Sequence, residues 1–275
     1  MRISEVHFPE TIQELVSLLS KSPEIQLLAG GTEIAGSQAS RSLLLDPDVA
    51  SIAKIRELRN TSRTEQYLEV GACTTLTGLL GLSLGVLPEP LASVIHGIAN
   101  HAVRNIATIG GNLCSRIRFM DLWPTLTCLD TQAEIRSPEG TRWVSLWHFA
   151  DEGGNPAFPA AALLTRLRIP LRSYNFSFIR KLGAPGYPSE ETALFVCIAN
   201  ASRSKIEEFR LAFAGKRAFR NRDLELSVSG RKSSLSPKEI LALSDAFKES
   251  YSKREFIDPR LFASLLEEAL EGLFG

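Results

Sequence analysis

Two short stretches decide how this chain of 275 residues is interpreted: Leu28-Ala29-Gly30-Gly31-Thr32-Glu33-Ile34 and Thr108-Ile109-Gly110-Gly111-Asn112. Each holds a glycine pair that follows an apolar run and precedes a small polar residue. Because glycine has no Cβ, the backbone at such a pair can approach a ligand closely and adopt positive φ. Successive backbone N–H groups then form a concave nest for anionic oxygens. One such loop suits a phosphate, and two that converge suit the pyrophosphate of a dinucleotide.

The competing explanation is that each glycine pair only makes a tight turn. For either pair alone the two explanations are balanced, but two pairs, each expected at the end of an apolar strand, favour a phosphate site. The sequence contains neither GxGxxG nor GxxxxGK[ST]. An ordinary Rossmann fingerprint and a P-loop are therefore excluded.

Composition limits the partners. Lys+Arg and Asp+Glu both number 31, so the net charge is zero, and hydrophobic residues make up 44%. A neutral chain has no long-range attraction to nucleic acid or to an anionic membrane. No apolar run approaches the roughly 20 residues of a membrane helix, and residues 1–5 are no signal-peptide core. We expect a cytoplasmic protein, or part of a cytoplasmic complex, without nucleic acid and without membrane insertion.

The cysteines and histidines predict no metal centre. They are scattered along the chain at Cys73, Cys114, Cys128, Cys197, His7, His96, His101 and His148. Structural zinc and iron–sulfur clusters need converging thiolates, which sequences usually supply at short spacings. We interpret the cysteines as small buried thiols in a reducing compartment, and we assign no metal ligand and no catalytic acid or base.

Periodicity and turn residues predict a small α/β unit followed by two larger units. In the first, Thr11 and Glu14 have the spacing of a capping box, and Ile12, Leu15, Val16 and Leu19 fall on one helical face. Strands are expected at 25–29, 43–45, 67–70, 133–136, 142–144, 163–169, 176–180, 192–199 and 206–214. Short helices are expected before residue 82 and after Pro88, and longer ones at 237–250 and 259–273. A boundary is expected near residues 170–175, after Pro170.

The first glycine stretch, followed downstream by Arg-Asn-Ile-Ala-Thr-Ile-Gly-Gly-Asn-Leu (104–113), resembles the FAD-binding subunits of molybdenum hydroxylases. These include the flavin domain of xanthine dehydrogenases and the medium subunit of aerobic carbon monoxide dehydrogenases. The strands expected at 133–136 and 142–144 flank Ser137-Pro138-Glu139-Gly140, which predicts a hairpin with a type I turn. Segments 70–75 and 168–170, this hairpin and the C-terminal layout resemble the family in the same order, so the resemblance covers essentially the whole chain.

The resemblance implies an α+β fold. An FAD-binding domain of the PCMH or vanillyl-alcohol-oxidase type would span 1–172, with a small α/β unit at about 1–55 and a larger mixed-sheet unit at 56–172. A small α+β domain, similar to the C-terminal domain of the carbon monoxide dehydrogenase flavoprotein, would span 173–275.

The resemblance also implies the residues that hold FAD. The two loops would grip its pyrophosphate, with side-chain hydrogen bonds from Thr32, Thr108 and Asn112. Asp121 would bind the ribityl or adenosine part, and its alternative is a loop aspartate that caps the next helix. Leu164 would lie near the flavin, although any strand leucine would look the same. The predicted cofactor-binding residues are Leu28, Ala29, Gly30, Gly31, Thr32, Glu33, Ile34, Thr108, Ile109, Gly110, Gly111, Asn112, Asp121, Leu164 and Arg180.

Several positions depart from the family pattern or stay open. Arg180 stands where xanthine dehydrogenases carry a lysine, and its alternative is an exposed strand-end cation. Arg116 and Arg118 lie in the stretch before Asp121, where many members have Ala-Asp-Pro or Ala-Ser-Pro, and they suit phosphate, a partner subunit or solvent. An aromatic residue that covers the flavin in some members has no counterpart here, and Ile98 lies at the nearest aligned position. The basic stretch Lys216, Arg217, Arg220 and Arg222 is interpreted as a solvated loop and is left unassigned.

The implied function is electron transfer. A partner subunit with molybdopterin would oxidise a substrate, [2Fe–2S] clusters on a small subunit would pass electrons, and FAD here would deliver them to NAD or another acceptor. Thr32-Glu33-Ile34 looks closer to xanthine dehydrogenases, which points weakly to a purine-like substrate. The alternatives are a stand-alone flavoprotein reductase or oxidase, and a non-catalytic scaffold that has lost FAD.

Overall fold

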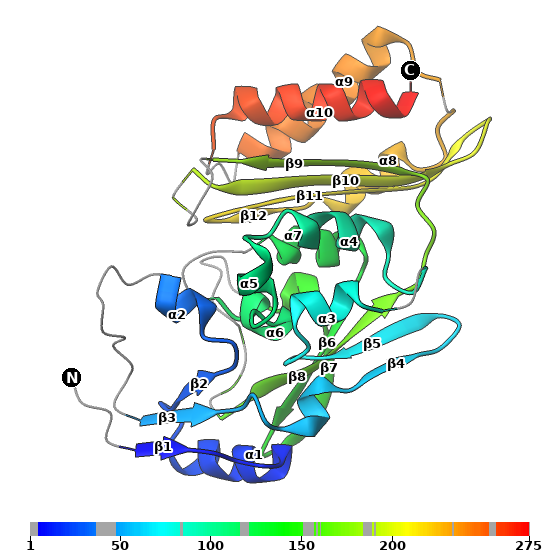
Figure 1. Ribbon diagram of the computed structural model, residues 1–275. Helices are drawn as coiled ribbons and strands as arrows, with labels where there is room; N and C mark the ends of the chain where they lie inside the picture. Colours follow the sequence, from blue (N-terminus) through cyan, green and yellow to red (C-terminus); the bar gives the residue numbers. More distant parts are fainter. Residues whose placement is uncertain are drawn as a thin grey trace.

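The computed structural model describes residues 5–36, 48–82, 85–115, 121–150, 157, 159, 161–183, 189, 191–232, 234–252 and 257–274. These residues form three sheets (Figure 1). Their buried apolar side chains form three hydrophobic clusters. The α+β class predicted from the sequence is confirmed. None of the described helices is both long enough and apolar enough to cross a membrane.

The N-terminal unit is a small parallel sheet with one long helix. Its elements are β1 (Glu5–His7), α1 (Ile12–Lys21), β2 (Gln26–Leu28), α2 (Thr32–Gly36) and β3 (Asp48–Ser51), with strand order β1-β3-β2. Thr11 caps α1 by accepting the N–H of Glu14 at 3.1 Å, and the Glu14 carboxylate accepts the N–H of Glu10 at 2.8 Å. Helix α1 buries the four predicted apolar residues. The expected strand 43–45 lies outside the described residues, and the sequence did not reveal β1 or β3.

The second unit is an antiparallel sheet covered by short helices. Strand order is β4 (Thr61–Arg63), β5 (Tyr67–Gly71), β8 (Leu163–Pro170), β6 (Gln132–Ser137) and β7 (Gly140–Ser145). The predicted hairpin, now β6–β7, is confirmed. The helical elements are η1 (Arg56–Arg59), α3 (Leu76–Leu80), α4 (Glu89–His96), α5 (His101–Arg104), α6 (Ile109–Leu113), α7 (Leu122–Cys128) and η2 (Leu146–His148). Helix α7 was not predicted, although all seven of its residues are buried.

The C-terminal unit is a sheet that is buried on both faces. Strand order is β12 (Ala218–Phe219), β11 (Ile206–Ala214), β10 (Ala193–Ala201) and β9 (Phe176–Leu182), and the helices are α8 (Arg222–Val228), α9 (Pro237–Ser252) and α10 (Pro259–Phe274). On β10, Phe195 and Cys197 face α9 and α10, whereas Leu194 and Val196 join the cluster of the second unit. Figure 1 shows this sheet between α9–α10 and the α4–α7 layer. Because both faces are covered, β10 is apolar without interruption from Ala193 to Ala199.

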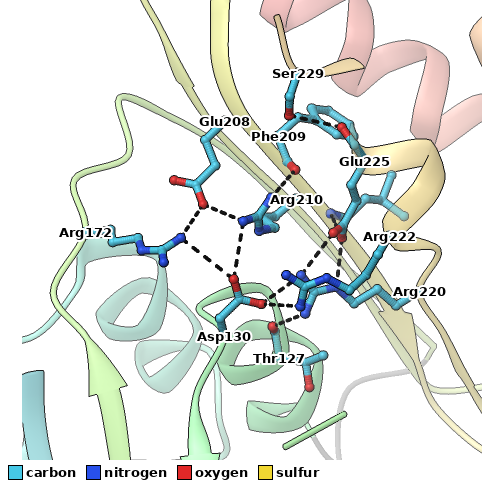
Figure 2. Close-up of polar contacts among 11 residues, drawn as sticks. Thr127, Asp130, Arg172, Glu208, Phe209, Arg210, Arg220, Arg222, Glu225 and Ser229 are labelled. Atoms are coloured by element: carbon cyan, nitrogen blue, oxygen red, sulfur yellow. Dashed lines mark hydrogen bonds and ion pairs between the residues drawn. The ribbon is translucent and has the colours of Figure 1, made fainter. Parts of the chain in front are cut away.

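A network of ion pairs joins the second and C-terminal units (Figure 2). Asp130, in the left-handed conformation with φ of 53° just after α7, lies 3.0 Å from Arg220, 3.3 Å from Arg210 and 2.9 Å from Arg222. Arg220 also pairs with Glu225 at 2.9 Å, and both side chains are only 1% exposed. The interpretation of this basic stretch as a solvated loop is therefore wrong for Arg220. A buried guanidinium is tolerated because every charge near it is paired.

Candidate functional site: two glycine stretches and the start of α7

The first glycine stretch connects β2 to α2 and offers a run of backbone N–H groups as hydrogen-bond donors. Gly31 has a φ of 68°, a left-handed conformation that side chains disfavour. Among the described residues, no group accepts a hydrogen bond from the backbone N–H of Gly30, Gly31, Thr32 or Glu33. Four successive donors in a turn are the arrangement that a nest for anionic oxygens requires.

The second glycine stretch differs from the prediction. It does not end a strand: Thr108 is the N-cap of α6, and Ile109 to Leu113 are helical. The N–H groups of Ile109 and Gly110 donate to the carbonyls of Thr74 and Ala72 at 3.0 and 2.8 Å, and that of Gly111 donates to the Thr108 hydroxyl at 3.0 Å. The expectation of a second backbone nest is therefore wrong, because capping and packing already use these donors.

The first stretch nevertheless packs against the segment that leads into the second. A Cβ built on Gly30 would lie 2.0 Å from the carbonyl oxygen of Ile106, two residues before Thr108. A Cβ on Gly110 would lie 2.7 Å from the Cβ and the carbonyl oxygen of Ala72. The first glycine of each pair is thus required by backbone packing. Gly31 and the exposed Gly111 are the glycines that remain open to a ligand.

Asn112 is oriented by the start of α7. Its Oδ1 accepts the N–H of Leu122 at 3.2 Å. A backbone N–H requires an oxygen acceptor, so this bond decides which end of the amide faces α7. The Nδ2 group is left as a donor with no partner among the described residues.

Asp121 forms an ion pair between the start of α7 and the C-terminal sheet. Its carboxylate, 14% exposed, pairs with the Lys181 ammonium of β9. Asp121 occupies the N-cap position of α7, but its side chain makes no capping hydrogen bond. The alternative that it caps the following helix is therefore wrong. Lys181 was not predicted from the sequence.

Arg180 lies on the opposite face of β9. It pairs with Glu268 of α10 at 2.7 Å, and its guanidinium lies 4.3 Å from the centre of the Phe178 ring. Phe178 belongs to the cluster under α9 and α10, whereas Ile179 packs against the cluster of the second unit. Because strand side chains alternate between faces, a shift of one residue changes the face. Arg180 is therefore turned toward α10, whereas Lys181 is turned toward Asp121 and the start of α7.

Two further residues that the sequence singled out lie in the core of the second unit. Leu164 is 5% exposed and opposite Ile135 in the core of the second unit. Ile98 is 9% exposed in the same core. Ile106, whose carbonyl meets Gly30, exposes 54% of its surface, and the sequence analysis did not select it. Arg116 and Arg118 lie outside the described residues.

Solved structures with the same arrangement show the fold. A chain of quinoline 2-oxidoreductase from Pseudomonas putida 86 matches with a TM-score of 0.78 and 19% identity, covering 100% of both chains. A chain of carbon monoxide dehydrogenase from Hydrogenophaga pseudoflava matches with a TM-score of 0.82 and 20% identity, covering 99% of this chain and 97% of that one. The fold is therefore that of these two chains.

The sequence defines the family. Residues 2–172 match the family described as the FAD binding domain in molybdopterin dehydrogenase, and the chain belongs to this family. Aldehyde oxidase 2 of Rattus norvegicus is 31% identical over 173 residues, which are 59% of this chain and 13% of that protein. The xanthine dehydrogenase FAD-binding subunit of Escherichia coli O157:H7 is 30% identical over 166 residues, 60% of this chain and 56% of that subunit. The matched segment is thus little more than half the length of the shorter relative.

FAD is the cofactor that this family binds, and the residues present fit it. The first stretch offers four N–H donors without acceptors among the described residues, beside a glycine at positive φ. The bare surface of Gly111 and the Nδ2 donor of Asn112 lie on the second stretch. A dinucleotide with anionic oxygens needs donors and close backbone approach of this kind.

Proposed function

We propose that the chain is the FAD-binding electron-transfer subunit of a molybdenum-containing hydroxylase or dehydrogenase, similar to xanthine dehydrogenase. The observation that carries the proposal is the run of N–H donors in the first glycine stretch that have no acceptor among the described residues, in a loop that packs against Ile106, two residues before the second stretch. In this proposal residues 1–172 bind FAD, and residues 173–275 form a second domain that packs on the first.

Each stretch has its own task. Gly31, Thr32 and Glu33 donate backbone hydrogen bonds to the pyrophosphate, while Leu28, Ala29 and Ile34 flank it. Gly111 lets the ligand approach α6, and Asn112 donates from Nδ2. The hydroxyls of Thr32 and Thr108 add donors, since the bond from Gly111 uses only an acceptor position of Thr108.

The partners follow from the same proposal. Bound FAD accepts electrons singly from iron–sulfur clusters and releases them in pairs, to NAD or another acceptor. The clusters would lie on a small [2Fe–2S] subunit, and the molybdopterin on a large subunit, within a cytoplasmic complex. This chain's residues contribute binding and orientation of the flavin, with Asp121 and Lys181 beside the second stretch.

The test is an absorbance spectrum of the purified chain before and after incubation with FAD and removal of the excess. We expect flavin bands that stay with the protein and release FAD, not FMN, on denaturation. Asn112→Asp should retain less FAD, because it keeps an oxygen for Leu122 but places a negative charge where a donor stood. Asn105→Ala, in the same segment, is the control.

Two results would overturn the proposal. A chain that stays colourless with FAD, both alone and in a co-purified complex, would be a scaffold that has lost the cofactor. A purified chain that by itself turns over a donor and an acceptor would be a stand-alone flavoprotein reductase or oxidase.

A further inference from the structure

A continuous set of polar contacts runs from the C-terminal domain to the second glycine stretch. The ammonium of Lys181 on β9 pairs with the Asp121 carboxylate. The next residue, Leu122, begins α7 and donates its N–H to Oδ1 of Asn112 at 3.2 Å. Asn112 ends the second glycine stretch. A charge on the C-terminal sheet is therefore two side-chain contacts away from the amide that faces the ligand.

The far end of α7 is held by the same domain. The Thr127 carbonyl accepts a hydrogen bond from the Arg220 guanidinium, and Asp130 pairs with Arg220 and Arg210 (Figure 2). All residues from Leu122 to Cys128 are buried. A buried helix anchored at both ends has one position, because close-packed interiors leave little room for small shifts.

We propose that Lys181 is a positioning residue for the flavin site and acts through Asp121 and α7 on Asn112. Asp121 is 14% exposed, so without Lys181 its carboxylate must move toward water to be solvated. That movement displaces the first turn of α7 and breaks the bond from Leu122 to Asn112. The Asn112 amide can then rotate, and its Nδ2 donor is no longer held toward the ligand. This inference rests on the proposed binding of FAD by the second stretch.

The neighbouring residue supplies a matched control. Arg180 is on the same strand and carries the same charge, and it is exposed to 49% against 41% for Lys181. It pairs with Glu268 on the other face of the sheet and makes no contact with α7 among those described. Loss of either charge alters the surface to a similar extent, but only Lys181 is connected to Asn112.

The experiment compares FAD affinity, measured by quenching of flavin fluorescence, for the wild type, Lys181→Met, Lys181→Arg and Arg180→Met. Lys181→Met should weaken FAD binding about tenfold, as for loss of one charge-assisted hydrogen bond. Lys181→Arg should restore affinity to within about twofold, and Arg180→Met should stay within the same range. Far-UV circular dichroism and melting of the apo chains verify that each variant folds.

A double-mutant cycle with Asn112→Ala shows whether Lys181 acts through Asn112. In the Asn112→Ala background, Lys181→Met should cost less than about twofold. The same tenfold loss in both backgrounds, or wild-type affinity of Lys181→Met, would overturn the inference. An equal loss with Arg180→Met would overturn it as well. A wild-type chain that binds no FAD, either alone or in a co-purified complex, would instead refute the proposed function.

Discussion

Replacing Gly30 with alanine tests why the first glycine pair is needed. The added methyl group would lie 2.0 Å from the Ile106 carbonyl oxygen and 2.7 Å from its carbon. Because carbon–oxygen contacts settle near 3.3 Å, the two segments would have to separate by about 1.3 Å. Both contacts are backbone atoms, so no flexible side chain can move aside to relieve the overlap.

This separation predicts two measurable losses for Gly30→Ala. Overpacking of this kind costs about 1–3 kcal/mol of unfolding free energy, and a displacement near 1 Å is enough to spoil a preformed site. We expect FAD affinity to fall at least about tenfold. Flavin titration gives the affinity, and urea unfolding of the apo chain gives stability without the contribution of bound ligand.

Gly81→Ala is the control for the same chemical change. Its methyl group would lie 3.5 Å from the nearest carbonyl oxygens, and its φ is −78°, so alanine fits there. The reasoning is refuted if Gly30→Ala matches Gly81→Ala in both affinity and stability. A loss of affinity without any loss of stability would instead mean that the methyl group only blocks the ligand.

Three further outcomes follow from the charges and thiols. Arg220→Met leaves the Glu225 carboxylate buried and unpaired and should cost about 3–5 kcal/mol of unfolding free energy. Arg222→Met removes a side chain that is 53% exposed and leaves Asp130 paired with Arg220 and Arg210, so it should cost less than about 1 kcal/mol; urea unfolding compares the two. Burial raises the pKa of Asp130, but the charges of Arg220 and its neighbours outweigh burial and hold this pKa below the ordinary value. The stabilisation is present above about pH 4 and is lost as the pH falls through the lowered pKa, so urea melts of Asp130→Asn and wild type should converge in acid; a constant difference would contradict this. Burial raises the pKa of Cys73 to about 11, so a maleimide should label Cys114 in the folded chain and Cys73 only after unfolding, as peptide mass spectrometry would show.

Local patterns were enough for much of the fold. The capping box and the apolar spacing located α1, and uninterrupted or alternating apolar runs located β5, β6, β7, β8, β10 and β11. The short elements β1, β3, β4, β12 and α8 were not predicted, because so few residues show too little periodic pattern. Helix α7 was not predicted, because a helix that is buried on all sides has no amphipathic period.

The site shows the same division. The sequence assigned both glycine pairs and Asn112 to one cofactor site, because residue type and spacing along the chain are enough to recognise these motifs. It misassigned the backbone of the second pair, since whether an N–H is free depends on which carbonyls reach it, and here Thr74 and Ala72 do. It selected Arg180 and not Lys181, because the sequence does not reveal which face of β9 turns toward Asp121 and the start of α7.

The sequence by itself therefore determined the family, the cofactor and the residues that can carry the phosphate chemistry. Only the tertiary structure decided which glycine of each pair packs against backbone, which end of the Asn112 amide faces outward, and which cation meets Asp121. The physical reason is that residue type and spacing are properties of neighbouring residues. Free donors, buried charges and close backbone contacts depend on segments that meet only when the chain is folded, such as Gly30 with Ile106.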